Sequence, residues 1–192
     1  MNERNDRIDY WFWKKFFNKK KIIEINNLIE KNFHDYQIPE KGALNVNNEP
    51  KKNSLVKVVS WKIVKNLLHD IHVKAIDSAR KNFGYNVYEM SEEDTCLLNI
   101  YSSNNNSKYD WHTDGSCSNL YDCKLTVLIN LSLNSYEGGD FKLFNNNEYL
   151  VNELKDPGNV IIFKSNINHC VTPITKGERR TLTMFILGPR FT

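Results

Sequence analysis

The pattern of hydrophobic and polar positions divides the chain into a helix-rich first half and a strand-rich second half. From 125 to 133 every second residue is leucine, valine or isoleucine, with mostly polar residues between, which is the period of a strand with one buried face. Shorter apolar runs between Asn, Gly and Pro residues predict further strands at 96–101, 141–144, 160–163 and 181–187. The second half is therefore expected to be antiparallel β structure.

The first half shows helical spacing in two stretches. Apolar residues recur at three- and four-residue steps between Ile22 and Phe33, behind a potential N-cap at Asn18, and predict a helix that ends near Asn32. The same spacing over residues 61–83 predicts one or two further helices. Residues 36–54 carry prolines, a glycine and several asparagines without a period, and predict a loop.

Two features of the first half have more than one interpretation. Residues 9–17 are dense in aromatic side chains beside lysines, which fits a membrane-surface anchor or a buried strand, and the strand is favoured. His69 and His72 lie three apart on a predicted helix, a spacing that could hold a metal. Because no third ligand is nearby in the sequence, an ordinary surface or core role is favoured for this pair.

Composition changes this picture only slightly. The 26 basic and 23 acidic residues leave a net charge of +3, too small for a dedicated nucleic-acid binder. No segment has the roughly 18 apolar residues of a membrane span, and short basic runs such as Lys51-Lys52 are interpreted as solvent-exposed. The cysteines form no C-x-x-C pair and the charged start resembles no signal peptide, so free thiols in the cytoplasm are expected.

Two distant motifs carry candidate metal chemistry. His112 and Asp114 lie two apart in a segment of strand character, so their side chains share a face. One more histidine from another strand would complete a facial set of two histidines and one carboxylate, which leaves three open positions on an octahedral Fe(II). An apolar run leads to His169, and ten residues later Arg179 opens the next apolar run. The H-x-D motif alone is common by chance, so the argument depends on the joint pattern.

The joint pattern resembles the Fe(II)/2-oxoglutarate-dependent oxygenase superfamily, and within it the prolyl-4-hydroxylase-like branch. Besides H-x-D, the shared blocks are a glycine turn at 137–141, the spacing His169-x-Val171-x-Pro173, and Gly177-x-Arg179-x-Thr181. They cover about 96–189, half of the chain. The resemblance implies a mainly β fold with flanking helices (α+β), in which N-terminal helices buttress a double-stranded β-helix, or jelly-roll, core. We expect a single oxygenase domain over 1–192, with a helix-rich flank at 1–90 and the core at 91–192.

The resemblance also implies roles for individual residues. His112, Asp114 and His169 would hold Fe(II), and 2-oxoglutarate would chelate it through its 1-carboxylate and keto oxygen. Arg179 would grip the far carboxylate of 2-oxoglutarate through two charge-assisted hydrogen bonds. The neighbouring Arg180 should point the other way on the strand.

Four further residues are assigned to the same pocket. Thr181 shares the strand face of Arg179 and can add a hydroxyl to the same carboxylate. Tyr101 is a further expected donor to 2-oxoglutarate, Asn99 lies on the same face as Tyr101, and Tyr109 is expected to form a wall of the pocket.

The implied activity is hydroxylation of a peptidyl proline, a free amino acid or a similar small substrate. It would consume O2 and 2-oxoglutarate, release succinate and CO2, and use ascorbate as a reductant. Neither nucleic acid nor a membrane is an expected partner. Two alternatives stay open: a nucleobase dealkylase, although that branch has a second arginine where this chain has Phe185, and an inactive jelly-roll binding protein.

Overall fold

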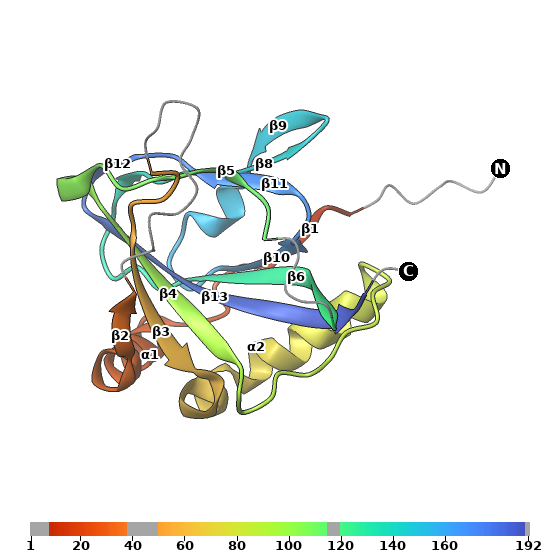
Figure 1. The fold of residues 1–192 in the computed structure, drawn as a ribbon. Helices are drawn as coiled ribbons and strands as arrows, with labels where there is room; N and C mark the ends of the chain where they lie inside the picture. Colours follow the sequence, from red (N-terminus) through yellow and green to blue (C-terminus); the bar gives the residue numbers. More distant parts are fainter. Residues whose placement is uncertain (1–7, 38–49, 115–119, 191–192) are drawn as a thin grey trace.

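The computed structural model describes residues 8–37, 50–114 and 120–190, and shows antiparallel sheets backed by two long helices (Figure 1). The largest sheet has the strand order β1-β10-β6-β13-β4-β3-β2, the second has the order β5-β11-β8-β9, and β12 pairs with β7. Side chains from the two larger sheets pack against one another in one hydrophobic cluster, so these sheets face each other. The mainly β, jelly-roll fold predicted from the sequence is confirmed.

The bounds of the strands are grouped here by sheet. The largest sheet consists of β1 (Tyr10–Trp13), β10 (Val160–Lys164), β6 (Tyr121–Asn130), β13 (Glu178–Pro189), β4 (Thr95–Ser102), β3 (Leu55–Ser60) and β2 (His34–Gln37). The second sheet consists of β5 (Tyr109–His112), β11 (Asn168–Val171), β8 (Phe141–Asn145) and β9 (Asn147–Leu150), and the small pair consists of β12 (Ile174–Lys176) and β7 (Glu137–Gly138). Short 3-10 helices lie at Ser103–Asn105 and Asn152–Leu154.

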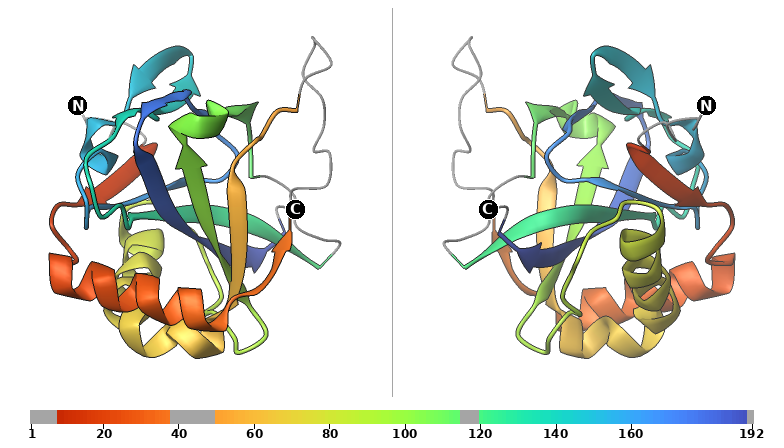
Figure 2. Two further views of the ribbon diagram at one scale, coloured as in Figure 1. Left: turned by 90° about the vertical axis from the view of Figure 1, so that its left-hand side faces the viewer. Right: turned by 90° about the vertical axis from the view of Figure 1, so that its right-hand side faces the viewer.

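Helices α1 (Lys19–Asn32) and α2 (Trp61–Lys81) both cover the outer face of the largest sheet, opposite the second sheet (Figure 2). The predicted N-cap of α1 is confirmed, because the Asn18 side chain accepts a hydrogen bond from the backbone N–H of Lys21 at 2.9 Å. The stretch predicted as one or two helices is the single helix α2. No helix of the described residues is both long and apolar enough to cross a bilayer.

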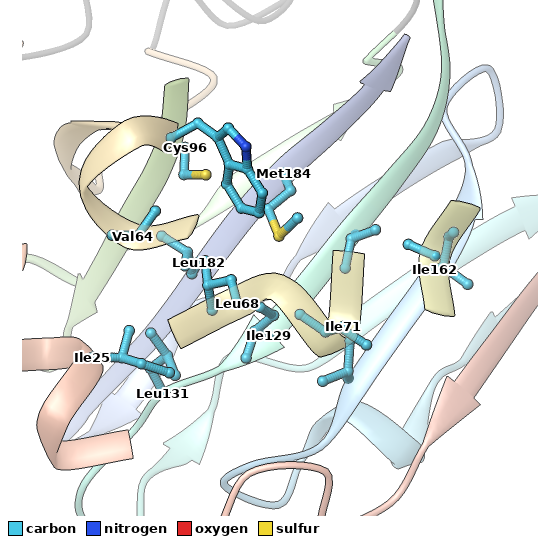
Figure 3. Close-up of a cluster of buried hydrophobic side chains, with 14 of the residues drawn as sticks. Ile25, Val64, Leu68, Ile71, Cys96, Ile129, Leu131, Ile162, Leu182 and Met184 are labelled. Atoms are coloured by element: carbon cyan, nitrogen blue, oxygen red, sulfur yellow. The ribbon is translucent and has the colours of Figure 1, made fainter. Parts of the chain in front are cut away.

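Alternate residues of β13 face two different environments. Leu182, Met184 and Ile186 pack into the hydrophobic cluster between the sheet and the helices (Figure 3). Arg179 and Thr181, offset by one position, line a cavity between the two larger sheets. The same alternation holds in β6, so the prediction that only one face of this strand is buried was wrong. The polar positions read as solvent-facing lie inside the barrel instead.

Other predicted elements differ from the structure near the N-terminus. The strand expected within 9–17 is β1, which lies at the edge of the sheet and leaves Trp11 41% exposed. It ends before Lys15, whose φ of 50° turns the chain toward α1. The helix-rich flank also contributes β2 and β3 to the sheet, and β2 overlaps the start of the predicted 36–54 loop. Most of that loop, residues 38–49, lies outside the described part of the chain.

The favoured interpretation of His69 and His72 agrees with the structure. His72 is buried beside Trp61, with ring centroids 5.0 Å apart, and its Nε2 accepts a hydrogen bond from the backbone N–H of Met90 at 3.2 Å. Burial lowers the pKa of His72, which keeps the acceptor nitrogen unprotonated. Among the described residues, neither histidine belongs to a group of three potential metal ligands.

We expect Gly158→Ala to destabilise the protein by about 2 to 4 kcal/mol, since it adds overpacking to left-handed strain. Gly158 has a φ of 81°, and a Cβ there would overlap the carbonyl oxygen of Phe17. Gly84 provides a matched control, because its φ is 68° but a Cβ would meet no atom within 4 Å. Gly84→Ala should therefore cost only about 1 kcal/mol. Equal losses in urea unfolding would contradict the steric explanation.

Candidate active site

A cavity of about 110 Å³ lies between the two larger sheets and brings the predicted site residues together. All eight of them line it: Asn99, Tyr101, Tyr109, His112, Asp114, His169, Arg179 and Thr181. They come from β4, β5, β11 and β13 and from the residues just after β5. The strand topology therefore joins segments that are up to 82 positions apart, from Asn99 to Thr181.

Three potential metal ligands converge on one side of this cavity. β5 ends at His112, and β11 pairs with it so that His169 lies directly opposite His112. Nε2 of His112 is 3.6 Å from one carboxylate oxygen of Asp114, and Nε2 of His169 is 3.5 Å from the other. The ligand atoms of the three residues all lie within 4.8 Å of one another, so one ion placed among them would contact all three.

Backbone carbonyls orient both imidazole rings. Nδ1 of His112 lies 2.8 Å from the carbonyl oxygen of Asp110, and Nδ1 of His169 lies 2.9 Å from that of Ile167. A carbonyl only accepts, so in each neutral ring Nδ1 carries the hydrogen and Nε2 keeps its lone pair. Both lone pairs then face Asp114, which is the arrangement that a metal ion requires.

The carboxylate of Asp114 is held from behind and stays ionised. Thr126 donates a hydrogen bond to it at 2.7 Å, and the backbone N–H of Asp114 donates to the carbonyl oxygen of Ser165 at 2.9 Å. Burial would raise the pKa of Asp114, but the adjacent imidazoles of His112 and His169 and the hydrogen bond from Thr126 outweigh this effect and hold the pKa well below its usual range. Burial also lowers the pKa of His112. Two imidazole nitrogens and one carboxylate suit a divalent ion such as Fe(II).

The cavity also contains a buried group that is suited to binding an anion. Arg179 is only 2% exposed, and its guanidinium carbon lies 5.3 Å from the ring centroid of Tyr101. Among the residues that the structure describes, Nη2 of Arg179 and the hydroxyl of Thr181 are buried without a hydrogen-bond partner. Such groups are costly to leave unpaired, so they mark a place for an acceptor supplied by a ligand. The far carboxylate of 2-oxoglutarate fits this place chemically.

Arg180 points away from the cavity, as the strand alternation predicts. Its guanidinium pairs with Glu30 of α1 at 3.0 Å and with Glu178 at 2.7 Å, and it donates to the side chain of Asn26 at 3.1 Å. Arg180 therefore ties α1 to the sheet, and Arg179 is the arginine available to a ligand inside the barrel.

The two tyrosines of the cavity keep their phenolic protons. Burial raises the pKa of Tyr101 to about 12 and that of Tyr109 to about 12, so both hydroxyls can donate at neutral pH. The ring of Tyr109 stacks on His112, with centroids 3.4 Å apart and planes 13° apart. Tyr109 thus forms a wall of the cavity beside the candidate metal site.

Lys52 also lines the cavity, although the sequence was interpreted as placing it on the surface. It is half-buried, and its ammonium donates to the Asn99 side-chain oxygen at 2.7 Å. Ser54 and Val56, two and four positions later, are buried as well. This period of two, continuing into β3, is the signal that could have identified Lys52, but it is obscured by Lys51 and by the charged Lys57 within β3.

The fold and the site together define a jelly-roll protein with a two-histidine, one-carboxylate centre and a buried arginine in one cavity. Residues 96–187 match the model of the 2OG-Fe(II) oxygenase superfamily. The resemblance predicted from the sequence is therefore confirmed over these residues, and the matched superfamily is one whose members use Fe(II) and 2-oxoglutarate.

Two curated relatives and one solved structure extend this result. A PKHD-type hydroxylase of Synechococcus sp. is 31% identical over 84 residues, which are 43% of this chain and 37% of that protein. The PKHD-type hydroxylase YbiX of Shigella boydii is 34% identical over 99 residues, 48% of this chain and 42% of that protein. The matched region thus spans less than half the length of these relatives. A prolyl-4-hydroxylase of Pseudomonas putida shares the fold, with a TM-score of 0.68 at 14% identity over 95% of this chain and 93% of that chain.

Proposed function

We propose that this protein is an Fe(II)- and 2-oxoglutarate-dependent dioxygenase that hydroxylates its substrate. The observation that carries the proposal is the pairing of two incomplete binding sites in one cavity. One is the cluster of His112, Asp114 and His169, and the other is Arg179, whose buried Nη2 has no hydrogen-bond partner among the described residues. A metal and a dicarboxylate that chelates it would satisfy both at once.

Each of these site residues then has a defined role in binding the metal or the co-substrate. His112, Asp114 and His169 would hold the ion, and three protein ligands would leave it able to bind the co-substrate and O2. Arg179 and Thr181 bind the far carboxylate and so fix the direction in which 2-oxoglutarate lies, while Tyr101 offers a protonated hydroxyl beside Arg179. When bound, Fe(II) and 2-oxoglutarate supply the oxidation that couples hydroxylation to release of succinate and CO2. Ascorbate as a reductant stays a prediction.

Peptidyl proline, a free amino acid or a similar small molecule is the proposed substrate class. Phe185 lines the cavity where the nucleobase dealkylase branch carries a second arginine. The net charge of +3 also provides little attraction for a polyanionic strand. Both observations favour small or peptidic substrates over nucleic acid.

We also propose a cytoplasmic location, in keeping with the buried thiols of Cys96 and Cys170, whose pKa values burial raises to about 12 and about 11.

The test is a parallel assay of proline-rich peptides, free amino acids and methylated oligonucleotides. We expect substrate-dependent succinate release and incorporation of an oxygen atom from O2 with a peptide or an amino acid, and none with the oligonucleotide. Asp114→Ala protein serves as the inactive control. Oxygen incorporation confined to the oligonucleotide would overturn the substrate class, and absence of both 2-oxoglutarate binding and succinate release would overturn the dioxygenase itself.

A further inference from the structure

Lys52 places a positive charge in the wall of the cavity. It lies just before β3, and its backbone forms an isolated bridge to Tyr109 at the start of β5. Its ammonium donates to the Asn99 side-chain oxygen at 2.7 Å and lies 4.8 Å from the ring centroid of Tyr109. The ammonium is thus positioned by a hydrogen bond on one side and by an aromatic face on the other.

The position of this charge relates it to the candidate metal site. The same Tyr109 ring that contacts Lys52 stacks on His112, one of the three converging ligands. Lys52 and the three converging ligands also line the same cavity, so a group bound to the Lys52 ammonium would lie in the space where the reacting carbon of a substrate has to be held.

The charges of the loaded cavity do not balance without a further anion. Lys52, Asp114 and Arg179 are the charged residues among the described ones that line it. Asp114 and Arg179 offset each other, and the charges of Fe(II) and of the 2-oxoglutarate dianion cancel. The Lys52 charge remains, and in the described part of the chain it forms no ion pair with a carboxylate. A half-buried charge of this kind is stabilised by binding an opposite charge.

Protonation agrees with this role. Burial lowers the pKa of Lys52 to about 8, and the negative charge of Asp114 opposes that effect. At pH 7 most molecules therefore still carry the ammonium, which can act as a cationic donor.

We propose, building on the dioxygenase function above, that Lys52 binds a carboxylate of the substrate and so makes the protein selective for small organic acids such as free amino acids. A carboxylate carries the single negative charge that the cavity lacks. A phosphate monoester carries about 1.5 to 2 negative charges and would leave an excess. The backbone around a proline inside a peptide chain carries none. A free amino acid carries this carboxylate together with its own ammonium, so the match is a local one between its carboxylate and Lys52. Of the proposed substrates, free amino acids are the ones that bring a carboxylate close to the reacting carbon.

Binding can be tested without turnover. Protein loaded with redox-inert Mn(II) and 2-oxoglutarate under nitrogen is titrated by calorimetry with each of the common free L-amino acids and with its primary amide. Each amide keeps the side chain and removes the carboxylate charge. We expect at least one acid to bind, and its amide to bind about 10-fold or more weakly, since a hydrogen bond to a charged group is at stake.

Two variants assign the effect to Lys52. Lys52→Met should weaken the acid about 10-fold or more and abolish its advantage over the amide. Lys52→Arg keeps the charge and should keep the preference. Both variants should bind 2-oxoglutarate with nearly parental affinity, which also shows that their cavities are folded.

Several results would overturn the assignment. These are amides that bind as tightly as acids, acid binding that survives Lys52→Met, no binding by any acid, or a loss of 2-oxoglutarate affinity in Lys52→Met, which would make Lys52 part of the co-substrate site. Parental protein that fails to bind 2-oxoglutarate would instead remove the dioxygenase function, and this inference with it. Because 2-oxoglutarate and the acids are titrated separately, the two failures are distinguishable.

Discussion

Alanine in place of His112, Asp114 or His169 is expected to lower the affinity of the protein for Fe(II) by more than about 100-fold. Loss of a group that merely supports a ligand costs about 10- to 100-fold, and loss of the ligand itself should cost more. The three ligand atoms lie within 4.8 Å of one another, so no ligand is peripheral to the cluster. The measurement is bound iron per protein after anaerobic equilibration and desalting, for which the parent should retain about one ion.

His69→Ala is the matched control for this series. His69 is an exposed histidine on α2 and does not line the cavity, so its removal should leave iron binding unchanged. Parental iron content in all three ligand variants would show that the cluster is not the metal site. Loss of iron in His69→Ala as well would indicate adventitious binding to surface histidines.

Arg179→Leu is expected to weaken 2-oxoglutarate binding by about 30-fold or more while Mn(II) or Fe(II) still binds. Removing one partner of a buried, hydrogen-bonded charge pair costs roughly 2 to 5 kcal/mol, because the other charge remains buried. Here the pair is the Arg179 guanidinium and the far carboxylate of 2-oxoglutarate. Nη2 of Arg179 is buried and has no acceptor in the described part of the chain. Calorimetric titration of the metal-loaded variant with 2-oxoglutarate measures the effect.

Arg180→Leu is the matched control, because it shows whether a loss of 2-oxoglutarate affinity arises in the cavity or from lower stability of the whole protein. It removes the same charge one position along β13, but it breaks contacts to Glu30, Glu178 and Asn26 outside the cavity. We expect it to lower the free energy of unfolding while changing 2-oxoglutarate affinity only slightly. Similar losses of affinity in the two variants would mean that the cavity tolerates either arginine or that both act through stability.

Local patterns in the sequence were sufficient to predict the helices and much of the β core. α1 and α2 have apolar residues at regular helical steps, and Asn18 caps α1 as expected. β3 was missed because its buried Lys57 interrupts the apolar pattern. That lysine is accommodated by an ion pair with Glu30 and by the ring of Phe33, contacts between distant segments that no local pattern shows.

The site was predicted to the extent that its residues fall into motifs. His112 and Asp114 lie two positions apart, at the end of β5 and just after it, and the alternation of β13 distinguishes Arg179 from Arg180. His169 lies on β11, a strand of only 4 residues, and was found through its spacing to Arg179 rather than through its own pattern. Lys52 belongs to no motif, and a pair of lysines usually marks a solvated surface. Its place in the cavity depends on how β3 joins the sheet.

Because side chains alternate between the two faces of β13, the pairing of the whole sheet determines whether Arg179 faces the cavity. β13 is paired on one side with β4 and on the other with β6. A slip of one residue in this strand would turn Arg179 and Thr181 toward the helices and bring Arg180 and Leu182 into the cavity. Substitutions in the layer between sheet and helices that loosen this pairing can therefore weaken co-substrate binding from a distance, and selection on the activity also acts on the hydrophobic packing beneath the sheet.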